Sequence, residues 1–217
     1  MSRFLRWPLA LLTALVAINE LVLRRRIMNW GATRAEVREA LPGDDLVPNP
    51  LSLSTRAVTI DAPPAAVWPW IVQMGYGRAG WYSYDWIEWL MGAGKYVEGR
   101  SAVRIHPELQ DLKAGDLVPF SRFNAIPVTA IQPERYLVIG NSWAFVLKPI
   151  DGQRTRLVVR TRNPGFLGRS GRPWGPIVHV LDLILNYLGY EPGLHLLMER
   201  KMMLGIKERA ERMAKGG

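Results

Sequence analysis

Five short segments that favour β-strands follow one another between residues 116 and 162, and they constrain the fold more than any other feature. The segments are rich in β-branched and aromatic residues and are separated by turn formers. They cover residues 116–120, 126–132, 136–139, 142–150 and 155–162. Asp151 and Gly152 form a typical hairpin turn between the last two segments. Strands so close in sequence predict an antiparallel sheet.

The last two segments indicate how side chains divide between the faces of this sheet, because alternate residues of a strand point to opposite faces. In the first of them, Trp143, Phe145 and Leu147 share a face. In the second, one face carries Leu157, Val159 and Thr161, and the other carries Arg156, Arg160 and Arg162. We therefore expect one apolar face and one solvated face.

One further strand and a helix are expected before residue 80. Val58 and Ile60 alternate with polar neighbours over residues 55–61, which is typical of a half-buried strand. Prolines then open a helix that continues through residues 65–74, with a kink at Pro69.

Capping residues mark two shorter helices. Residues 33–36 read Thr-Arg-Ala-Glu, a capping box that starts a helix. Ser83 or Asp85 is expected to cap another helix, which ends at Met91.

Two helices are expected after the strands. Residues 176–189 have only a narrow polar stripe, so this helix must meet core or lipid. Residues 193–214 form a long helix whose apolar stripe includes Leu194, Leu197, Met198 and Met202.

An apolar stretch near the N-terminus predicts a membrane anchor. Residues 7–23 are interrupted only by Asn19 and Glu20, and a spanning helix needs about 20 apolar residues. Leu15 and Ala17 do not form a signal-peptidase site, so we expect the segment to be retained. The alternative is an interfacial or core-docked helix. The arginines on the two flanks nearly balance, and they slightly favour a folded domain on the cytoplasmic side.

The net charge of +9 gathers at the two ends of the chain. Residues 1–30 hold five arginines against one glutamate, and residues 200–217 hold six basic residues against two glutamates. A nucleic-acid-binding protein would carry a basic stripe within the fold itself. The observed distribution favours anionic membrane lipids as partners and gives no reason to expect nucleic acid.

The sequence contains no cysteine, which excludes disulfides, thiolate catalysis and cysteine-ligated zinc. The histidines His106, His179 and His195 lack the spacing of metal ligands. We expect neither a metal nor a cofactor.

Several stretches resemble bacterial members of the SRPBCC superfamily, the START-like group named for polyketide cyclases, dehydrases and lipid-transport proteins. The likeness is carried by residues 55–90, which include IDAPPAAVW, and by PELQDLKAGD, SWAFVLKP and LMERKMMLGIKERAE. It covers roughly residues 31–215. It implies an α+β helix-grip fold, in which a curved antiparallel sheet wraps around a long C-terminal helix and encloses a deep cavity.

The domain organisation follows from these expectations. Residues 1–30 hold the anchor helix, residues 31–53 a short helix and linker, and residues 54–217 the START-like domain. Superfamily members include binders, carriers and cyclases, so the resemblance does not select one activity.

Gly75, Gly77 and Gly80 spell the dinucleotide-binding pattern G-x-G-x-x-G. That pattern requires a strand before it and a helix that opens from it. Here a helix precedes it, so we interpret the glycines as a turn between two helices that uses positive φ.

A dense set of aromatic residues suits a pocket for an apolar ligand. The expected ligand-binding residues are Trp68, Trp81, Tyr82, Tyr84, Trp86, Trp89, Phe120, Trp143 and Phe145. The alternative is an aromatic core or a belt at a membrane interface.

Candidate catalytic residues are few: Tyr82, Tyr84, Asp85 and His106. Asp85 and Glu88 could share one helix face as acid and base, but such a pair is more often a cap and a solvated side chain.

Three functions therefore stay open. The first is a binder or carrier of a lipid, quinone or polyketide-like molecule at the membrane. The second is a cyclase- or dehydratase-like enzyme that uses the same cavity. The third is a membrane scaffold whose own aromatic side chains fill that cavity.

Overall fold

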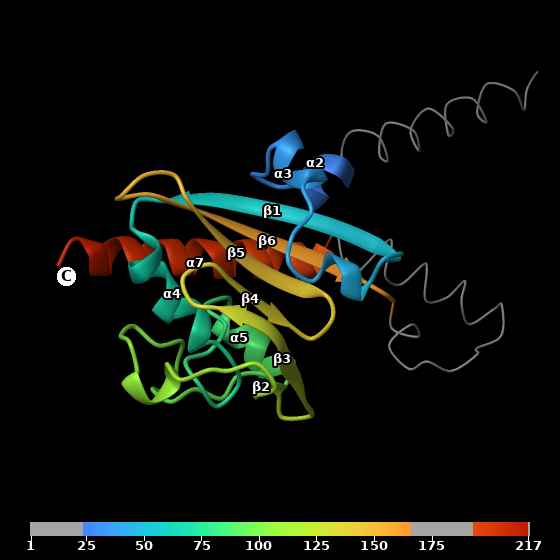
Figure 1. Cartoon of the computed structure of the whole chain (residues 1–217). Helices are drawn as coiled ribbons and strands as arrows, with labels where there is room; N and C mark the ends of the chain where they lie inside the picture. Colours follow the sequence, from blue (N-terminus) through green and yellow to red (C-terminus); the bar gives the residue numbers. More distant parts are fainter. Residues whose placement is uncertain (1–23, 166–192, 217) are drawn as a thin grey trace, which may run out of the picture.

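The computed structural model describes residues 24–165 and 193–216, which form an antiparallel sheet crossed by a long helix (Figure 1). The sheet has six strands in the order β1-β6-β5-β4-β3-β2, and every neighbouring pair is antiparallel. The strands are β1 Ser52–Ile60, β2 Leu117–Ser121, β3 Asn124–Gln132, β4 Tyr136–Ile139, β5 Trp143–Pro149 and β6 Thr155–Asn163. The antiparallel α+β architecture expected from the sequence is confirmed.

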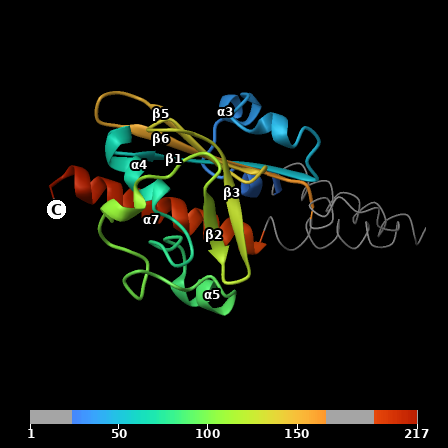
Figure 2. The same cartoon turned by 60° about the horizontal axis from the view of Figure 1, so that its bottom comes forward.

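The long C-terminal helix α7 (Leu196–Ala214) lies across one face of the sheet, as Figures 1 and 2 show from two directions. It contacts β1 and the helix α4 (Pro64–Val72), which contains Pro69. Its buried side chains recur at helical spacing at Met202, Met203, Ile206 and Ala210. The structure is thus consistent with a helix gripped by a sheet.

Gly205 lets α7 approach the chain at Tyr82. A Cβ atom at Gly205 would lie 2.6 Å from the Tyr82 carbonyl oxygen, closer than a side-chain carbon can come. This glycine therefore fixes how deeply the helix sits in the core.

The core lies between the sheet, α4 and α7. Phe145, Leu147, Leu157 and Val159 all lie in it and are almost fully buried. The apolar inner face expected from their alternation is confirmed.

The expected solvated outer face is wrong at β1 and β6. Helices α2 (Arg25–Met28), α3 (Arg34–Arg38) and η2 (Asp44–Leu46) cover it, and Val158 is fully buried (Figure 1). Arg160 is only 2% exposed.

Arg160 can be buried because its guanidinium donates hydrogen bonds to the unpaired backbone carbonyls at the end of α3. It donates to the backbone carbonyls of Glu36 and Glu39, each at 2.7 Å, and pairs with the Asp44 carboxylate at 2.6 Å. The last carbonyls of a helix have no partner within it, and an arginine can supply several donors at once.

The capping box of α3 is confirmed. The Glu36 N–H donates to the Thr33 hydroxyl at 3.2 Å, and the Thr33 N–H donates to the Glu36 carboxylate at 2.7 Å. The same carboxylate accepts two hydrogen bonds from Arg156, which together with the bonds from Thr33 lower the pKa of Glu36 to about 2 against the effect of burial.

Helix α5 spans Asp85–Leu90 and is not capped as expected. Its N-cap is Tyr84, which makes no side-chain cap. The Asp85 carboxylate instead accepts hydrogen bonds from the Ser101 N–H at 3.2 Å and the Ser101 hydroxyl at 2.7 Å. The expected capping by Ser83 or Asp85 is therefore wrong.

The glycine pattern forms a tight turn after α4. Gly75, Gly77 and Gly80 have φ values of 134°, 68° and 81°, which confirms the use of positive φ. A remaining short helix, η3 (Pro107–Leu109), follows this region.

Two expectations lie outside the described residues: the anchor over residues 7–23 and the helix over residues 176–189. Within the part of the chain that the structure describes, no helix has the length and apolar character needed to cross a bilayer.

Candidate functional site

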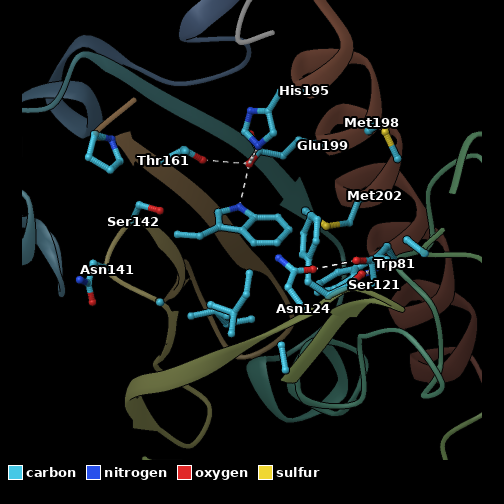
Figure 3. Close-up of a pocket in the computed structure, with 18 of the residues that line it drawn as sticks. Trp81, Ser121, Asn124, Asn141, Ser142, Thr161, His195, Met198, Glu199 and Met202 are labelled. Atoms are coloured by element: carbon cyan, nitrogen blue, oxygen red, sulfur yellow. Dashed lines mark hydrogen bonds and ion pairs between the residues drawn. The ribbon is translucent and has the colours of Figure 1, made fainter. Parts of the chain in front are cut away.

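A cavity of about 1200 Å³ lies between the inner face of the sheet and the first turns of α7 (Figure 3). Its walls come from strands β2 to β6, from the turn between β4 and β5, and from the second half of α5 and the residues that follow it. Residues 46–49 close another side. The aromatic side chains of the described residues leave this space open, whereas the third hypothesis expects them to fill it.

Three aromatic rings form much of the apolar wall. The ring centroid of Trp81 lies 5.2 Å from that of Phe120 and 5.5 Å from that of Trp143. The indole N–H of Trp81 donates to the Phe120 carbonyl at 3.2 Å, so its polar atom is satisfied. Met198 and Met202 of α7 also line the cavity (Figure 3).

A cluster of polar side chains at one end of the cavity is centred on the carboxylate of Glu199. Its Oε1 accepts a hydrogen bond from the Trp143 indole N–H at 2.8 Å and another from the Thr161 hydroxyl at 3.3 Å. The His195 Nε2 lies 3.7 Å from the same oxygen. Figure 3 shows His195, Thr161 and Glu199 together at this end of the cavity.

Glu199 forms a buried ion pair with Arg56 of β1. The two side chains are 1% and 0% exposed, and the Arg56 Nη1 donates to Glu199 Oε2. The Nη1 atom also lies 3.3 Å from the Nδ1 of His195. Burial alone would raise the pKa of Glu199, but the charges of Arg56 and His195 and the hydrogen bonds from Arg56 and Trp143 hold that pKa below its usual value. Glu199 is therefore a carboxylate at neutral pH.

His195 is the member of this cluster that a ligand can reach. Its side chain is 14% exposed, whereas that of Glu199 is 1% exposed and already accepts several hydrogen bonds. Both ring nitrogens of His195 face this pair, Nδ1 toward Arg56 and Nε2 toward Glu199, so a polar group in the cavity would share one of them. The polar end is thus suited to fixing the orientation of an otherwise apolar ligand.

A second carboxyl group, that of Glu88 in α5, lies in the wall of the cavity. It is fully buried and accepts hydrogen bonds from the Ser83 N–H and the Tyr96 hydroxyl, both at 3.1 Å. Burial raises its pKa to about 7, although both hydrogen bonds oppose this shift, and the nearby Asp85 adds to it. Glu88 can therefore exchange a proton near neutral pH, and the interpretation of this residue as a solvated side chain is wrong.

The structure divides the expected ligand-binding residues into three groups. Trp81, Phe120 and Trp143 line the cavity. Trp68, Tyr82 and Phe145 are packed in the core. Tyr84, Trp86 and Trp89 lie away from the cavity wall, and the two tryptophans are 66% and 73% exposed.

The expected catalytic residues are not brought together. The Tyr82 hydroxyl accepts a hydrogen bond from Gln73 at 2.8 Å, and burial raises its pKa. His106 is buried between Glu98 at 2.9 Å and Glu108 at 3.1 Å, and it lines neither pocket. Tyr82 and Asp85 border a separate hollow of about 270 Å³.

Metal ligands do not gather in the described part of the chain. No group of three histidine, aspartate or glutamate side chains in residues 24–165 and 193–216 is arranged to hold an ion.

Comparisons with known proteins give only distant likenesses. No family model and no curated protein matches the chain. One similar solved structure is a conserved protein of unknown function from Enterococcus faecalis, with 14% identity over 75% of this chain and 85% of that one and a TM-score of 0.31. Another is a polyketide-cyclase-like protein from Corynebacterium glutamicum, with 12% identity over 77% of this chain and 91% of that one and a TM-score of 0.31. At these TM-scores the likenesses carry no functional argument, which must come from the site itself.

The sequence interpretation missed Arg56, Glu199 and the role of His195. A signal was present for each. Arg56 lies two residues before Val58 and four before Ile60, so it points to the same inner face of β1. His195 and Glu199 are four residues apart and precede Met202 at helical spacing, which places both on the core side of α7.

Proposed function

We propose that this protein binds a hydrophobic small molecule, such as a lipid, a quinone or a polyketide-like compound, in the cavity beneath α7. One observation carries the proposal: a space of about 1200 Å³ is lined mainly by apolar side chains, with polar side chains at a few places that include the Glu199 end. Pockets for small ligands are commonly about 300–1000 Å³, mostly apolar, with a few polar groups that fix orientation.

Burial of the apolar part of the ligand would supply the driving force. Removing apolar surface from water contributes about 25 cal/mol per Å². The rings of Trp81 and Trp143 and the methionines of α7 provide the contacting surface. The polar group of the ligand would lie at the end of the cavity that His195 and Thr161 line, because the buried charges of Arg56 and Glu199 are paired with each other.

Membership of the START-like SRPBCC superfamily is part of this proposal. The antiparallel sheet with a C-terminal helix on its inner face supports it. The residues that carry the resemblance lie in β1, α4, α5, β5 and α7.

A membrane location is also proposed, on the basis of sequence alone. The apolar residues 7–23 would hold the protein at the bilayer, with the folded domain on the cytoplasmic side. A protein at that position could take up a ligand that partitions into lipid.

The test is to purify the full chain from host membranes and to combine native mass spectrometry with organic extraction. We expect a stoichiometric hydrophobic adduct on the wild type. Met198→Trp should weaken it, because the larger side chain would take up part of the cavity. Leu204→Trp is the matched control, since Leu204 is also half-buried on α7 but does not line the cavity.

Two outcomes would contradict the proposal. One is a bare protein mass together with an extract that contains no bound molecule. The other is an adduct that Met198→Trp and Leu204→Trp retain equally, which would place the molecule elsewhere on the chain.

An acid–base enzyme is the second candidate function, and Glu88 favours it. A buried carboxyl with a pKa of about 7 at a cavity wall is suited to proton transfer at neutral pH. Incubation of the extracted molecule with fresh protein would distinguish the two candidates. An enzyme would form a product that Glu88→Gln fails to form, whereas a binder would return the molecule unchanged.

A further inference from the structure

An exposed apolar patch lies beside the cavity, on the outer side of α5. Trp86, Trp89 and Leu90 are 66%, 73% and 72% exposed. Phe123, in the turn between β2 and β3, is 73% exposed. We call these four residues the α5 patch.

The two parts of the α5 patch are adjacent. The Arg122 N–H donates to the Gly92 carbonyl at 2.8 Å, which ties the β2–β3 turn to the end of α5. A Cβ atom at Gly92 would lie 2.9 Å from the Phe123 ring. Figures 1 and 2 both show α5 beside the tip of the β2–β3 hairpin.

The α5 patch also reaches the cavity. Phe123 belongs to both, and Met91, which directly follows Leu90, lines the cavity and is 38% exposed. A surface that covered the patch would therefore cover one side of the cavity opening.

The charges around the α5 patch are one-sided. Both acidic residues of α5 point inward, because Asp85 is bound to Ser101 and Glu88 to Ser83 and Tyr96.

Two cations remain on the outside of the α5 patch. Arg122 is exposed and its guanidinium carbon lies 4.5 Å from the Phe123 ring centroid. Lys95 is also exposed and follows Gly94, which packs against the Trp89 backbone. Neither cation forms an ion pair with another described residue.

We propose that the α5 patch docks onto the surface of an anionic lipid bilayer, so that the cavity opens toward the membrane. Tryptophan is favoured at the boundary between lipid and water, because its ring is apolar and its N–H is polar. Lys95 and Arg122 would meet the negative headgroups. The inference deepens the proposed function, since a hydrophobic ligand would then enter from the bilayer without crossing water.

The extent of the α5 patch favours a bilayer over a second copy of the chain. An aromatic side chain presents about 150–250 Å² when fully exposed, so the patch offers roughly 600 Å². Stable protein interfaces bury about 800 Å² on each partner. In a symmetric dimer, the patch would also bring its two cations against those of the partner.

Site-specific labels can test the docking, because the chain has no cysteine of its own. Full-length Leu90→Cys and Phe123→Cys would each carry one environment-sensitive fluorophore. Ile150→Cys is the control, since Ile150 is 47% exposed in the β5–β6 turn, away from α5 in Figures 1 and 2. The proteins would be placed in vesicles of phosphatidylcholine and phosphatidylglycerol that contain brominated acyl chains.

We expect bromine to quench the labels at residues 90 and 123 several-fold more than the label at residue 150. Adding Lys95→Glu and Arg122→Glu to the labelled chains should reduce this quenching. Equal, weak quenching at all three positions would overturn the proposal. A different result would be that the labels at residues 90 and 123 become shielded from water without vesicles, to an extent that rises with protein concentration. That result would also overturn the proposal, and it would indicate that a second copy of the chain covers the α5 patch.

Extraction of bound molecules from the same variants separates this proposal from the proposed function. If the hydrophobic adduct is retained but bromine does not quench the labels, only the docking proposal is contradicted. Quenched labels without an adduct in any variant would contradict only the ligand binding.

Discussion

Replacing Arg56 with methionine should lower the free energy of unfolding by about 3–5 kcal/mol, which is the usual cost of removing one partner from a buried ion pair. Arg56 and Glu199 are 0% and 1% exposed, so the carboxylate left behind could not be solvated. The measurement is urea denaturation of the full chain in detergent, with tryptophan fluorescence as the signal that monitors unfolding.

The double variant Arg56→Met/Glu199→Gln should recover most of this loss. It removes both charges, and the glutamine oxygen can still accept the Trp143 N–H bond that Glu199 now accepts at 2.8 Å. A single variant as stable as the wild type would mean that the ion pair is not buried. A double variant no more stable than the single one would mean that the pair itself, and not the unpaired charge, accounts for the loss.

Glu88→Gln should stabilise the protein at pH 8 and leave its stability unchanged at low pH. The pKa of Glu88 is about 7 in the folded protein and has an ordinary value of 4.5. The folded state therefore binds a proton at Glu88 more tightly than the unfolded state does. The contribution of Glu88 to the free energy of unfolding consequently falls as pH rises from 4.5 through 7. The gain of the variant at pH 8 should approach about 3 kcal/mol, at 1.36 kcal/mol per pKa unit.

Urea denaturation of both proteins between pH 4.5 and pH 8 would measure this effect. Glu134→Gln, in an exposed turn, controls for the loss of one negative charge. A gain that does not change with pH would contradict the raised pKa. A destabilisation at pH 8 would mean that the ionised carboxylate makes bonds that glutamine cannot replace.

The strands could be predicted from the sequence because their signals are local. Expected and observed boundaries agree within three residues for all six strands, and for residues 136–139 they coincide. Alternation along β5 and β6 also identified the inner face. The cover over the outer face could not be predicted, because Arg160 contacts carbonyls more than 120 positions earlier in the chain.

Helix α5 shows where local pattern is insufficient. Trp86, Trp89 and Leu90 form an apolar stripe, and such a stripe usually faces the core. In the structure the opposite side is fixed inward, because Glu88 bonds to Ser83 and Tyr96. Helical spacing groups these side chains correctly but does not indicate which side of the helix is buried.

The candidate site was only partly accessible from the sequence. Trp81, Phe120 and Trp143 were expected in a pocket because of residue type, and they line the cavity. The ion pair joins two residues 143 positions apart, so their spacing gave no direct signal. Placing Arg56 and Glu199 on the inner faces of their elements would have suggested that they meet.

A crystal structure of the protein purified from its own membranes would test the central claim most directly. We expect continuous density for a non-protein molecule along Trp81 and Trp143, with its polar end within hydrogen-bonding distance of His195. A cavity filled by rearranged side chains, or density for a bound molecule only at another place, would contradict the account.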